Sequence, residues 1–162
     1  MKLYHGSNIA VQNPQILESD RKLDFGTGFY LTSNLEQAER WAKLTQARRE
    51  NGTATVSVFE ADEKILNTLN VLHFQKADKS WLEFVTQNRK NVAQQNDSYD
   101  VVIGPVANDR TMPVISLYFS GIYDADETVK RLLPQKLNDQ YTFKTEKSLT
   151  ALNFIEAKTH DK

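Results

Sequence analysis

The stretch DFGTGFYLTSNLEQAERWA, residues 24–42, predicts a strand, a turn and a helix in direct succession. GFYLT is typical of a short strand, and Ser33, with Glu36 three residues later, forms a capping-box pattern that predicts a helix start. Apolar residues then recur at helical spacing, and Asn51-Gly52 is a plausible helix end. Two interpretations of Tyr30 and Trp41 remain open: they are core aromatics, or they line a slot for a flat ring.

Composition places the chain among ordinary globular proteins. Its 162 residues suit one domain over residues 1–162, with 40% hydrophobic and 25% charged residues. No apolar run has membrane-spanning length, the first residues lack a signal segment, and there is no cysteine. We therefore expect a cytoplasmic protein with no membrane segment.

The charge balance and the histidines exclude two further classes. With 20 basic and 21 acidic residues the net charge is −1, without the basic excess of a general nucleic-acid binder. His5, His73 and His160 lie far apart, without the close spacing of a helical metal pair. We expect no metal site.

The remaining segments predict an α+β protein. Short strands and helices alternate irregularly, which favours α+β over a regular strand-helix repeat. GTGFY is followed by strand and not by helix, so it is no dinucleotide-binding fingerprint. Further strands are expected over residues 2–6, 53–61, 99–105, 140–144 and 154–158, and further helices over 81–93, 113–119, 128–133 and 145–152.

Three segments together carry a family resemblance: LYHGS at residues 3–7, GTGFYLT at 26–32 and NDQYTFK at 138–144. As an ordered set they resemble the His-Tyr-Glu branch of the ADP-ribosyltransferase superfamily, the type of poly(ADP-ribose) polymerases and diphtheria toxin. The chain is also similar, over residues 2–155, to a bacterial family of uncharacterised domains related to these enzymes. The resemblance implies an ADP-ribosyltransferase-like fold, with a split, mostly antiparallel β core and flanking helices.

The resemblance also implies NAD as cofactor and a role for each matched residue. The rings of Tyr30 and Trp41 would stack on the nicotinamide, and the backbone of Gly6 would hold its carboxamide. His5 would bind an adenosine-ribose hydroxyl, and a loop arginine would suit a cofactor phosphate or the target. The implied cofactor-binding set is His5, Gly6, Ser7, Gly28, Tyr30, Trp41 and Arg110.

Two positions depart from the family pattern. Ala38 stands where the polymerases place a serine hydroxyl on the carboxamide, and Gln140 stands at the position of the catalytic glutamate. The implied catalytic set is thus Gln140, Tyr30 and His5. An amide keeps the acceptor but loses the charge, so a glutamate at position 140 is expected to speed nicotinamide release. Glu146 or Asp109 are alternative acids.

Arg110 ends the loop GPVANDR, residues 104–110, and has a second interpretation as part of an exposed turn closed by Asp109.

The leading functional prediction is an NAD-dependent mono-ADP-ribosyltransferase that modifies a protein or a nucleic acid. Related bacterial domains are often toxins or defence proteins, so a small inhibitory antitoxin is an expected partner. One alternative is a non-catalytic module that binds NAD or ADP-ribose, which Gln140 and Ala38 favour. Another is an enzyme like the RNA 2′-phosphotransferase, which calls for clustered arginines, of which the sequence identifies only Arg110.

Overall fold

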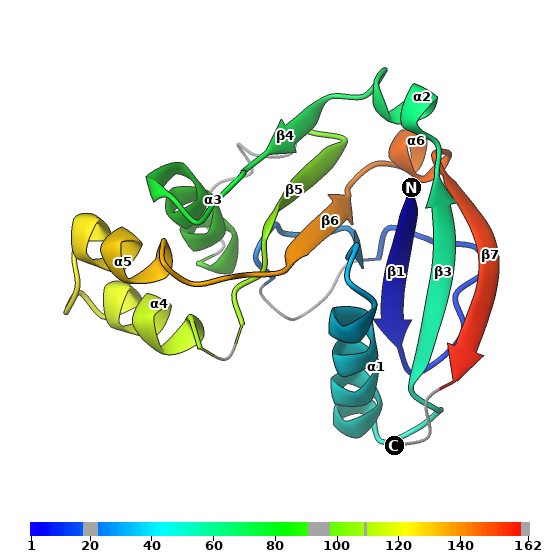
Figure 1. Cartoon of the computed structure of the whole chain (residues 1–162), viewed down its shortest axis with the longest axis horizontal. Coiled ribbons are helices and arrows are strands. Elements are labelled where there is room, and N and C mark those ends of the chain that lie inside the picture. Colours follow the sequence, from blue (N-terminus) through cyan, green and yellow to red (C-terminus); the bar gives the residue numbers. More distant parts are fainter. Residues whose placement is uncertain (18–22, 91–97, 109, 160–162) are drawn as a thin grey trace.

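The computed structural model describes residues 1–17, 23–90, 98–108 and 110–159. Its strands form two separate sheets (Figure 1). The first has the order β1-β3-β7 and is antiparallel throughout; its strands are β1 (Lys2–Ser7), β3 (Thr55–Ala61) and β7 (Leu152–Thr159). The second has the order β2-β6-β5-β4 and is antiparallel except for the β4–β5 pair; its strands are β2 (Phe29–Leu31), β6 (Asp139–Phe143), β5 (Val101–Pro105) and β4 (Val71–His73).

The helices divide between the two sheets. The longest, α1 (Leu35–Arg49), runs alongside β1, whereas three helices gather at the far end of the molecule (Figure 1): α3 (Lys79–Arg89), α4 (Met112–Phe119) and α5 (Ala125–Leu132). Two single-turn helices, α2 (Glu63–Leu66) and α6 (Glu146–Leu149), lie near the start of β7. The α+β prediction is confirmed. In the described part of the chain, no helix has the length and apolar character needed to cross a membrane.

The first helix starts one residue later than the capping-box pattern indicates. Asn34, not Ser33, is the N-cap: its side chain accepts a hydrogen bond from the Gln37 N–H at 2.8 Å. Ser33 instead donates its backbone N–H, at 2.9 Å, and its hydroxyl to Asp139 at the start of β6. This carboxylate ties the start of α1 to the second sheet, a long-range partner that outweighs the local pattern.

The strand predicted over residues 53–61 is more buried than its alternation indicates. In β3 every residue except Glu60 is buried, because β1 and β7 pair on either side of it. Val56 and Val58 pack beneath α1, whereas Phe59 joins the core on the opposite face. The central position of β3, and not its own pattern, determines this burial.

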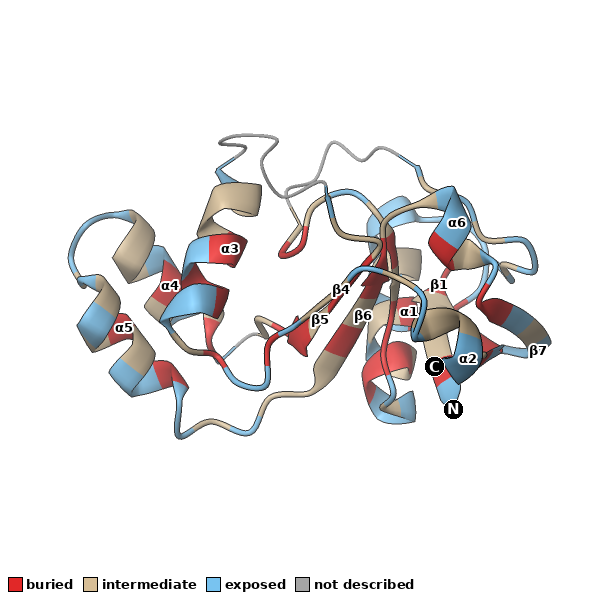
Figure 2. Cartoon of the chain, turned by 90° about the horizontal axis from the view of Figure 1, so that it is seen from above, coloured by how far each residue is buried: buried red, intermediate tan, exposed pale blue. Residues whose placement is uncertain are grey.

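The helix predicted over residues 81–93 is α3, the core of the group formed by α3, α4 and α5, which we call the far lobe. Asp78 caps α3 by accepting the Trp81 N–H at 3.0 Å, and the indole of Trp81 donates to the Pro105 carbonyl at 3.0 Å. Helical spacing predicts an inner face of Trp81, Leu82, Val85 and Val92. The first three are fully buried, and Val92 lies outside the described residues. Figure 2 shows buried residues along β6 and on α3, so the core extends from the second sheet into these helices.

Candidate active site

A cavity of about 570 Å³ opens between the first sheet with α1 and the second sheet with the α3 and α4 helices. Its volume is within the usual range for small-molecule sites. Its walls come from β1, α1, the loop before β2, β6, the loop after β5 and the end of α3. Six of the residues singled out from the sequence line it: His5, Gly6, Tyr30, Trp41, Arg110 and Gln140. Residues that are far apart in the chain therefore converge at one place.

His5 is held as a neutral imidazole with one ring nitrogen bonded to the backbone. Its Nδ1 lies 2.7 Å from the Tyr30 carbonyl oxygen, which only accepts, so Nδ1 carries the proton. Its ring stacks on Phe29 at 4.2 Å between centroids. Desolvation lowers the pKa of His5 from 6.5 to about 4, against the opposing effect of the Tyr30 carbonyl. At neutral pH Nε2 is therefore an acceptor, suited to a hydroxyl donor.

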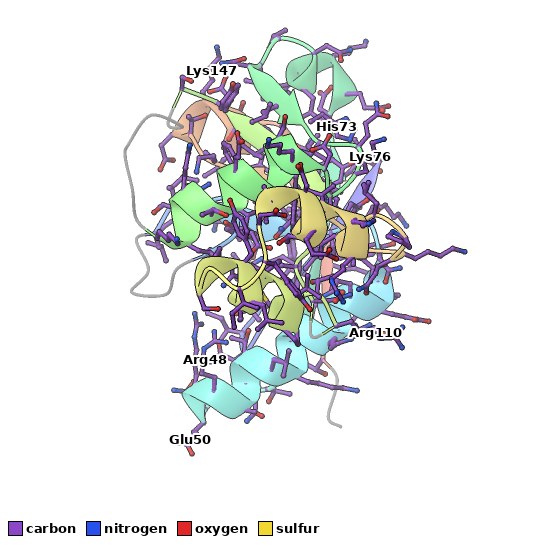
Figure 3. The ribbon with its side chains drawn as sticks, turned by 90° about the vertical axis from the view of Figure 1, so that its left-hand side faces the viewer. Arg48, Glu50, His73, Lys76, Arg110 and Lys147 are labelled. Atoms are coloured by element: carbon purple, nitrogen blue, oxygen red, sulfur yellow. The ribbon has the colours of Figure 1, made fainter. Side chains whose placement is uncertain are left out.

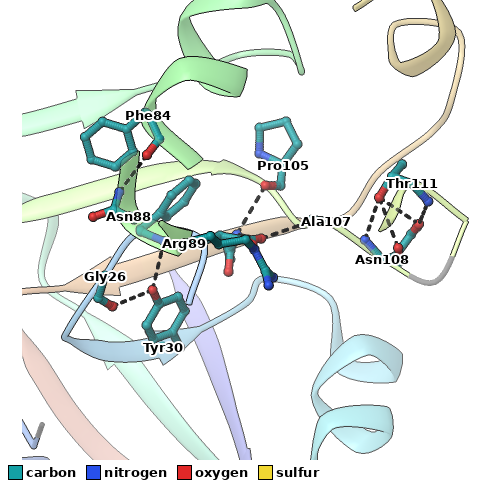
Figure 4. A network of polar contacts seen from close by, with 12 residues as sticks. Gly26, Tyr30, Phe84, Asn88, Arg89, Pro105, Ala107, Asn108 and Thr111 are labelled. Atoms are coloured by element: carbon teal, nitrogen blue, oxygen red, sulfur yellow. Dashed lines mark hydrogen bonds and ion pairs between the residues drawn. The ribbon is translucent and has the colours of Figure 1, made fainter. Parts of the chain in front are cut away.

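Tyr30 contributes its ring, because its hydroxyl is already bonded to backbone. The Oη donates to the Gly26 carbonyl at 2.7 Å and accepts the Phe25 N–H at 3.0 Å (Figure 4). Burial raises the pKa of this phenol, which therefore stays protonated. The half-buried ring packs against the core of the far lobe and lines the cavity. These bonds fix the ring's position and exclude acid-base work by its hydroxyl.

Trp41 faces the cavity from the other wall. It is half-buried on α1, whose core-facing side consists instead of the buried Gln37, Ala38 and Ala42. Helical spacing in the sequence predicts that Leu35 lies on one face with Trp41, but Leu35 is 38% exposed. The open question about Trp41 is thus decided by placement: it lines the cavity and is no core residue.

Gly6 serves the packing of α1 and also leaves backbone groups directed away from β3. A Cβ at this position would lie 2.1 Å from the Ala38 carbonyl oxygen, so only glycine allows α1 this close. On the side away from β3, Tyr4 exchanges backbone hydrogen bonds with Thr32 at 2.8 and 2.9 Å. Backbone groups two residues apart in a strand point to the same side, so the N–H and C=O of Gly6, like those of Tyr4, point away from β3.

Two of the expected cofactor contacts are not brought to the cavity. Ser7 is buried, with its hydroxyl donating to Asn8 Oδ1 at 3.3 Å. Gly28 faces β6, where a Cβ would lie 2.5 Å from the Thr142 methyl and 2.9 Å from the Phe143 carbonyl oxygen. Ser7 follows the cavity residue Gly6, so strand alternation turns its side chain to the other face, whereas Gly28 is turned from the cavity by its packing against β6. Neither is among the cavity-lining residues.

Gln140 is buried, and its amide orientation is fixed by two acceptors. Nε2 donates to Asp24 Oδ2 at 3.0 Å and to the Pro105 carbonyl oxygen at 3.2 Å. Because both contacts use the nitrogen, Oε1 is the atom available to a ligand in the cavity. Gln140 thus occupies the expected place with an acceptor of defined orientation.

The buried carboxylate of this site belongs to Asp24, which the motif comparison did not single out. Asp24 is 5% exposed and pairs with Arg89, whose Nη2 and Nε lie 2.5 and 2.7 Å from Oδ1. Its Oδ2 also accepts the Ala107 N–H at 3.0 Å (Figure 4). The sequence signal was slight: an acidic residue directly before the glycine-spaced turn, with its partner sixty-five residues away.

Arginines are more numerous around the cavity than the sequence indicated. Besides Arg110, the lining includes Arg40 and Arg48 from α1 and Arg89 from α3. The expectation that Arg110 stands alone was wrong, because α1 is folded against β1 with one arginine-bearing side toward the cavity. Of the two alternative acids, Glu146 starts α6 and lines a separate depression, and Asp109 lies outside the described residues.

In the described ranges of the chain, no group of three or more His, Asp or Glu side chains is arranged to hold a metal ion. The site is thus an aromatic and arginine-rich cleft between two sheets, with one buried carboxylate.

The chain belongs to the family described as Protein of unknown function (DUF3990), which matches residues 1–154. No curated protein matches the sequence. No solved structure matches the fold.

Proposed function

We propose that the protein is an NAD-dependent mono-ADP-ribosyltransferase with an ADP-ribosyltransferase-like fold, acting in the cytoplasm on a macromolecular acceptor. One observation carries the proposal: His5, Tyr30, Trp41 and Gln140, matched separately in the sequence, line a single cavity. The bacterial relatives that the sequence resembles suggest a toxin or defence role, with a small inhibitory antitoxin as partner.

The residues present fit NAD. Tyr30 and Trp41 offer flat rings to the nicotinamide, and Gly6 offers a backbone donor and acceptor to its carboxamide. His5 Nε2 accepts a ribose hydroxyl, and Arg110 suits the pyrophosphate. When bound, NAD supplies an ADP-ribosyl group with nicotinamide as its leaving group.

Gln140 determines how fast this chemistry is expected to be. Its Oε1 accepts a hydroxyl of the nicotinamide ribose and orients that sugar. A neutral amide does not offset positive charge that develops there, and such electrostatic stabilisation is usually the largest catalytic contribution. The nearby Asp24 carboxylate is balanced by Arg89 at 2.5 Å. We therefore expect slow hydrolysis of NAD by water, with transfer favoured by a good acceptor nucleophile.

Calorimetric titration with NAD tests the cofactor assignment. Trp41→Ala should weaken binding about five-fold or more, since a stacking contact is worth roughly 1 kcal/mol. Tyr30→Phe keeps the ring but loses the two hydroxyl hydrogen bonds that fix it, so it should bind NAD more tightly than Tyr30→Ala and less tightly than the parent. Tyr123→Ala is the matched control, because Tyr123 packs beside Arg131 and is not among the described cavity residues. Equal affinity in all variants would place the nicotinamide elsewhere.

The neutral Gln140 also favours a second candidate, a non-catalytic NAD or ADP-ribose binding module. Incubation with labelled NAD in cell lysate separates the two, because a binding module leaves no covalent label. The arginines around the cavity favour a third candidate, an enzyme like the RNA 2′-phosphotransferase. That activity would pass the 2′-phosphate of an RNA to the ADP-ribosyl group of NAD as nicotinamide leaves, which an RNA labelled at its 2′-phosphate detects as loss of label from the RNA.

A further inference from the structure

Gln37 is a buried amide in the cavity wall that has no role in the proposed chemistry. It is 4% exposed, lies in the first turn of α1 and lines the cavity. Figure 3 shows α1 in cyan, with Arg48 and Glu50 labelled at its C-terminal end; Gln37 belongs to the opposite end of the helix. Because buried polar side chains are almost always hydrogen-bonded, both ends of this amide need partners.

The local sequence pattern assigns the Gln37 side chain to helix capping, but the structure uses it differently. Asn34 and Gln37 have the spacing of a capping box, in which the second residue accepts the backbone N–H of the first. The Asn34 N–H is instead donated to Thr32 Oγ1 at 3.1 Å. The start of α1 therefore does not require the Gln37 amide.

Asn138 determines which end of the Gln37 amide meets the cavity. Its Nδ2 donates to Gln37 Oε1 at 3.0 Å, and Gln37 Nε2 has no hydrogen-bond partner in the described part of the chain. Among those residues, Thr142 Oγ1 is the one fully enclosed side-chain polar atom without a hydrogen bond, so Gln37 Nε2 is not enclosed by protein. Since Gln37 is buried yet lines the cavity, it directs this N–H donor into the cavity.

The same contact brings the Gln37 amide near Gln140. Asn138 directly precedes β6, and its carbonyl oxygen accepts the Val106 N–H at 2.8 Å, which continues the pairing of β5 with β6. Residues two apart in a strand project to one side and lie about 7 Å apart, so Asn138 holds Gln37 on the side from which Gln140 reaches the cavity. The wall thus offers two amides with opposite ends open: a donor at Gln37 Nε2 and an acceptor at Gln140 Oε1.

We propose that Gln37 is a further ligand-binding residue, which together with Gln140 recognises the two hydroxyls of the nicotinamide ribose. This inference rests on the proposed function, in which Gln140 Oε1 accepts one of these hydroxyls. Gln37 Nε2 donates to the oxygen of the other. Each hydroxyl both donates and accepts, so a neighbouring pair matches one amide oxygen and one amide nitrogen. The carboxamide of nicotinamide also offers a donor and an acceptor, but it is assigned to the backbone of Gly6.

Calorimetric titration of three ligands tests this placement: NAD, ADP-ribose and nicotinamide alone. Gln37→Met keeps the length of the side chain and removes its amide, so affinity for NAD and ADP-ribose should fall about three- to ten-fold. Affinity for nicotinamide, which has no ribose, should stay unchanged. Gln46→Met is the matched control, because Gln46 lies on the same helix and is not among the described cavity residues.

Gln37→Glu tests the direction of the hydrogen bond. It keeps an oxygen to accept Asn138 Nδ2 and places a second acceptor where the donor was, so it should weaken ADP-ribose binding more than Gln37→Met does. ADP-ribose affinity at the parent level in either variant would overturn the proposal.

Two further outcomes separate this proposal from its alternatives. An equal loss of nicotinamide affinity in Gln37→Met would overturn the ribose contact, because it would show that α1 has moved together with Trp41. A parent protein that binds neither NAD nor ADP-ribose would instead refute the proposed function itself.

Discussion

The side-chain amide of Gln140 acts as a hydrogen-bond donor to both of its polar neighbours. Both acceptors around Nε2, the Asp24 carboxylate and the Pro105 carbonyl, are fixed parts of the wall. Sequence comparison treats this position as a glutamate that has lost its charge. The contacts show a reason for the amide: a carboxylate at position 140 would face two acceptors with no proton to share.

This revises the expected effect of Gln140→Glu. The substitution should lower the free energy of unfolding by about 1–3 kcal/mol, because two carboxylates meet in a buried place and the Pro105 carbonyl keeps only the Trp81 indole of its two donors. Urea unfolding of Gln140→Glu, Asp24→Asn and the double variant measures the coupling. We expect the double variant to recover part of the summed loss, by about 0.5–3 kcal/mol. A Gln140→Glu protein that is as stable as the parent and releases nicotinamide faster would refute this pairing.

His5 makes stability depend on pH. Its folded pKa of about 4 lies below the ordinary 6.5, so between these values the unfolded chain binds more protons than the folded one. Stability from this group is therefore present above pH 6.5 and is lost as pH falls toward 4. The shift sets an upper limit of about 3 kcal/mol, and partial solvent access to the ring reduces it.

Urea unfolding at pH 7 and pH 5 checks the His5 effect. The parent should lose stability over this interval by more than His5→Gln does. His73→Gln is the matched control, since that histidine is exposed on β4. An identical pH dependence in the parent and His5→Gln would show that His5 is not responsible.

At the scale of elements, the position of α1 determines the site. The helix rests on β1 at Gly6, and Arg49 at its end donates to Asn8 Oδ1 at 2.8 Å. Its start is held by Asp139 through Ser33. Trp41 and the α1 arginines reach the cavity because these contacts fix the helix.

Gly6→Ala should displace α1. The new methyl group would lie 2.1 Å from the Ala38 carbonyl oxygen and 2.7 Å from the Ala42 nitrogen. Both are backbone atoms, so no side-chain rotation relieves the clash. We expect a stability loss of about 1–3 kcal/mol and weaker NAD binding, measured by thermal unfolding with and without NAD.

Gly121→Ala separates helix displacement from general destabilisation. Gly121 has a φ of 86° and open space around its Cβ position, so alanine there costs about 1–2 kcal/mol through backbone strain alone. NAD affinity should remain unchanged in this variant. Equal NAD affinity in Gly6→Ala would show that α1 has not moved from the ligand.

At the scale of the whole molecule, Asp24 joins four segments around the cavity. Its carboxylate contacts Arg89 at the end of α3, Ala107 in the loop after β5 and Gln140 on β6, while Asp24 itself precedes β2. The far-lobe helix α3 is thereby linked to the second sheet at the ligand wall.

Arg89→Gln should destabilise the protein by about 3–5 kcal/mol, because it leaves a buried carboxylate without its charged partner. Arg131→Gln is a matched control: Arg131 pairs with Glu127 at 2.9 Å on α5, both side chains are exposed, and such a pair is worth about 0.5 kcal/mol or less. The midpoints and slopes of urea unfolding curves compare the two. Similar losses would mean that the Asp24–Arg89 pair is not a stability determinant.

The sequence by itself determined features that depend on near neighbours. Asp124 heads a capping-box pattern and caps α5, and Asp78, which the sequence offers as a cap candidate together with Ser80, caps α3, since a side chain three residues from an N–H needs no tertiary partner. The strands containing His5 and Tyr30 were likewise predicted from local pattern, and with them the convergence of motifs that the resemblance implies.

Only the tertiary structure decided which residues meet. Asp24 and Arg89 are paired across sixty-five residues, and Asp24 and Gln140 across one hundred and sixteen. Ser7 is turned from the cavity by strand alternation and Gly28 by its packing against β6, and the arginines of α1 enter the wall because Gly6 admits the helix. Local periodicity carries no information on such contacts, because packing between distant segments selects one side of each strand and helix.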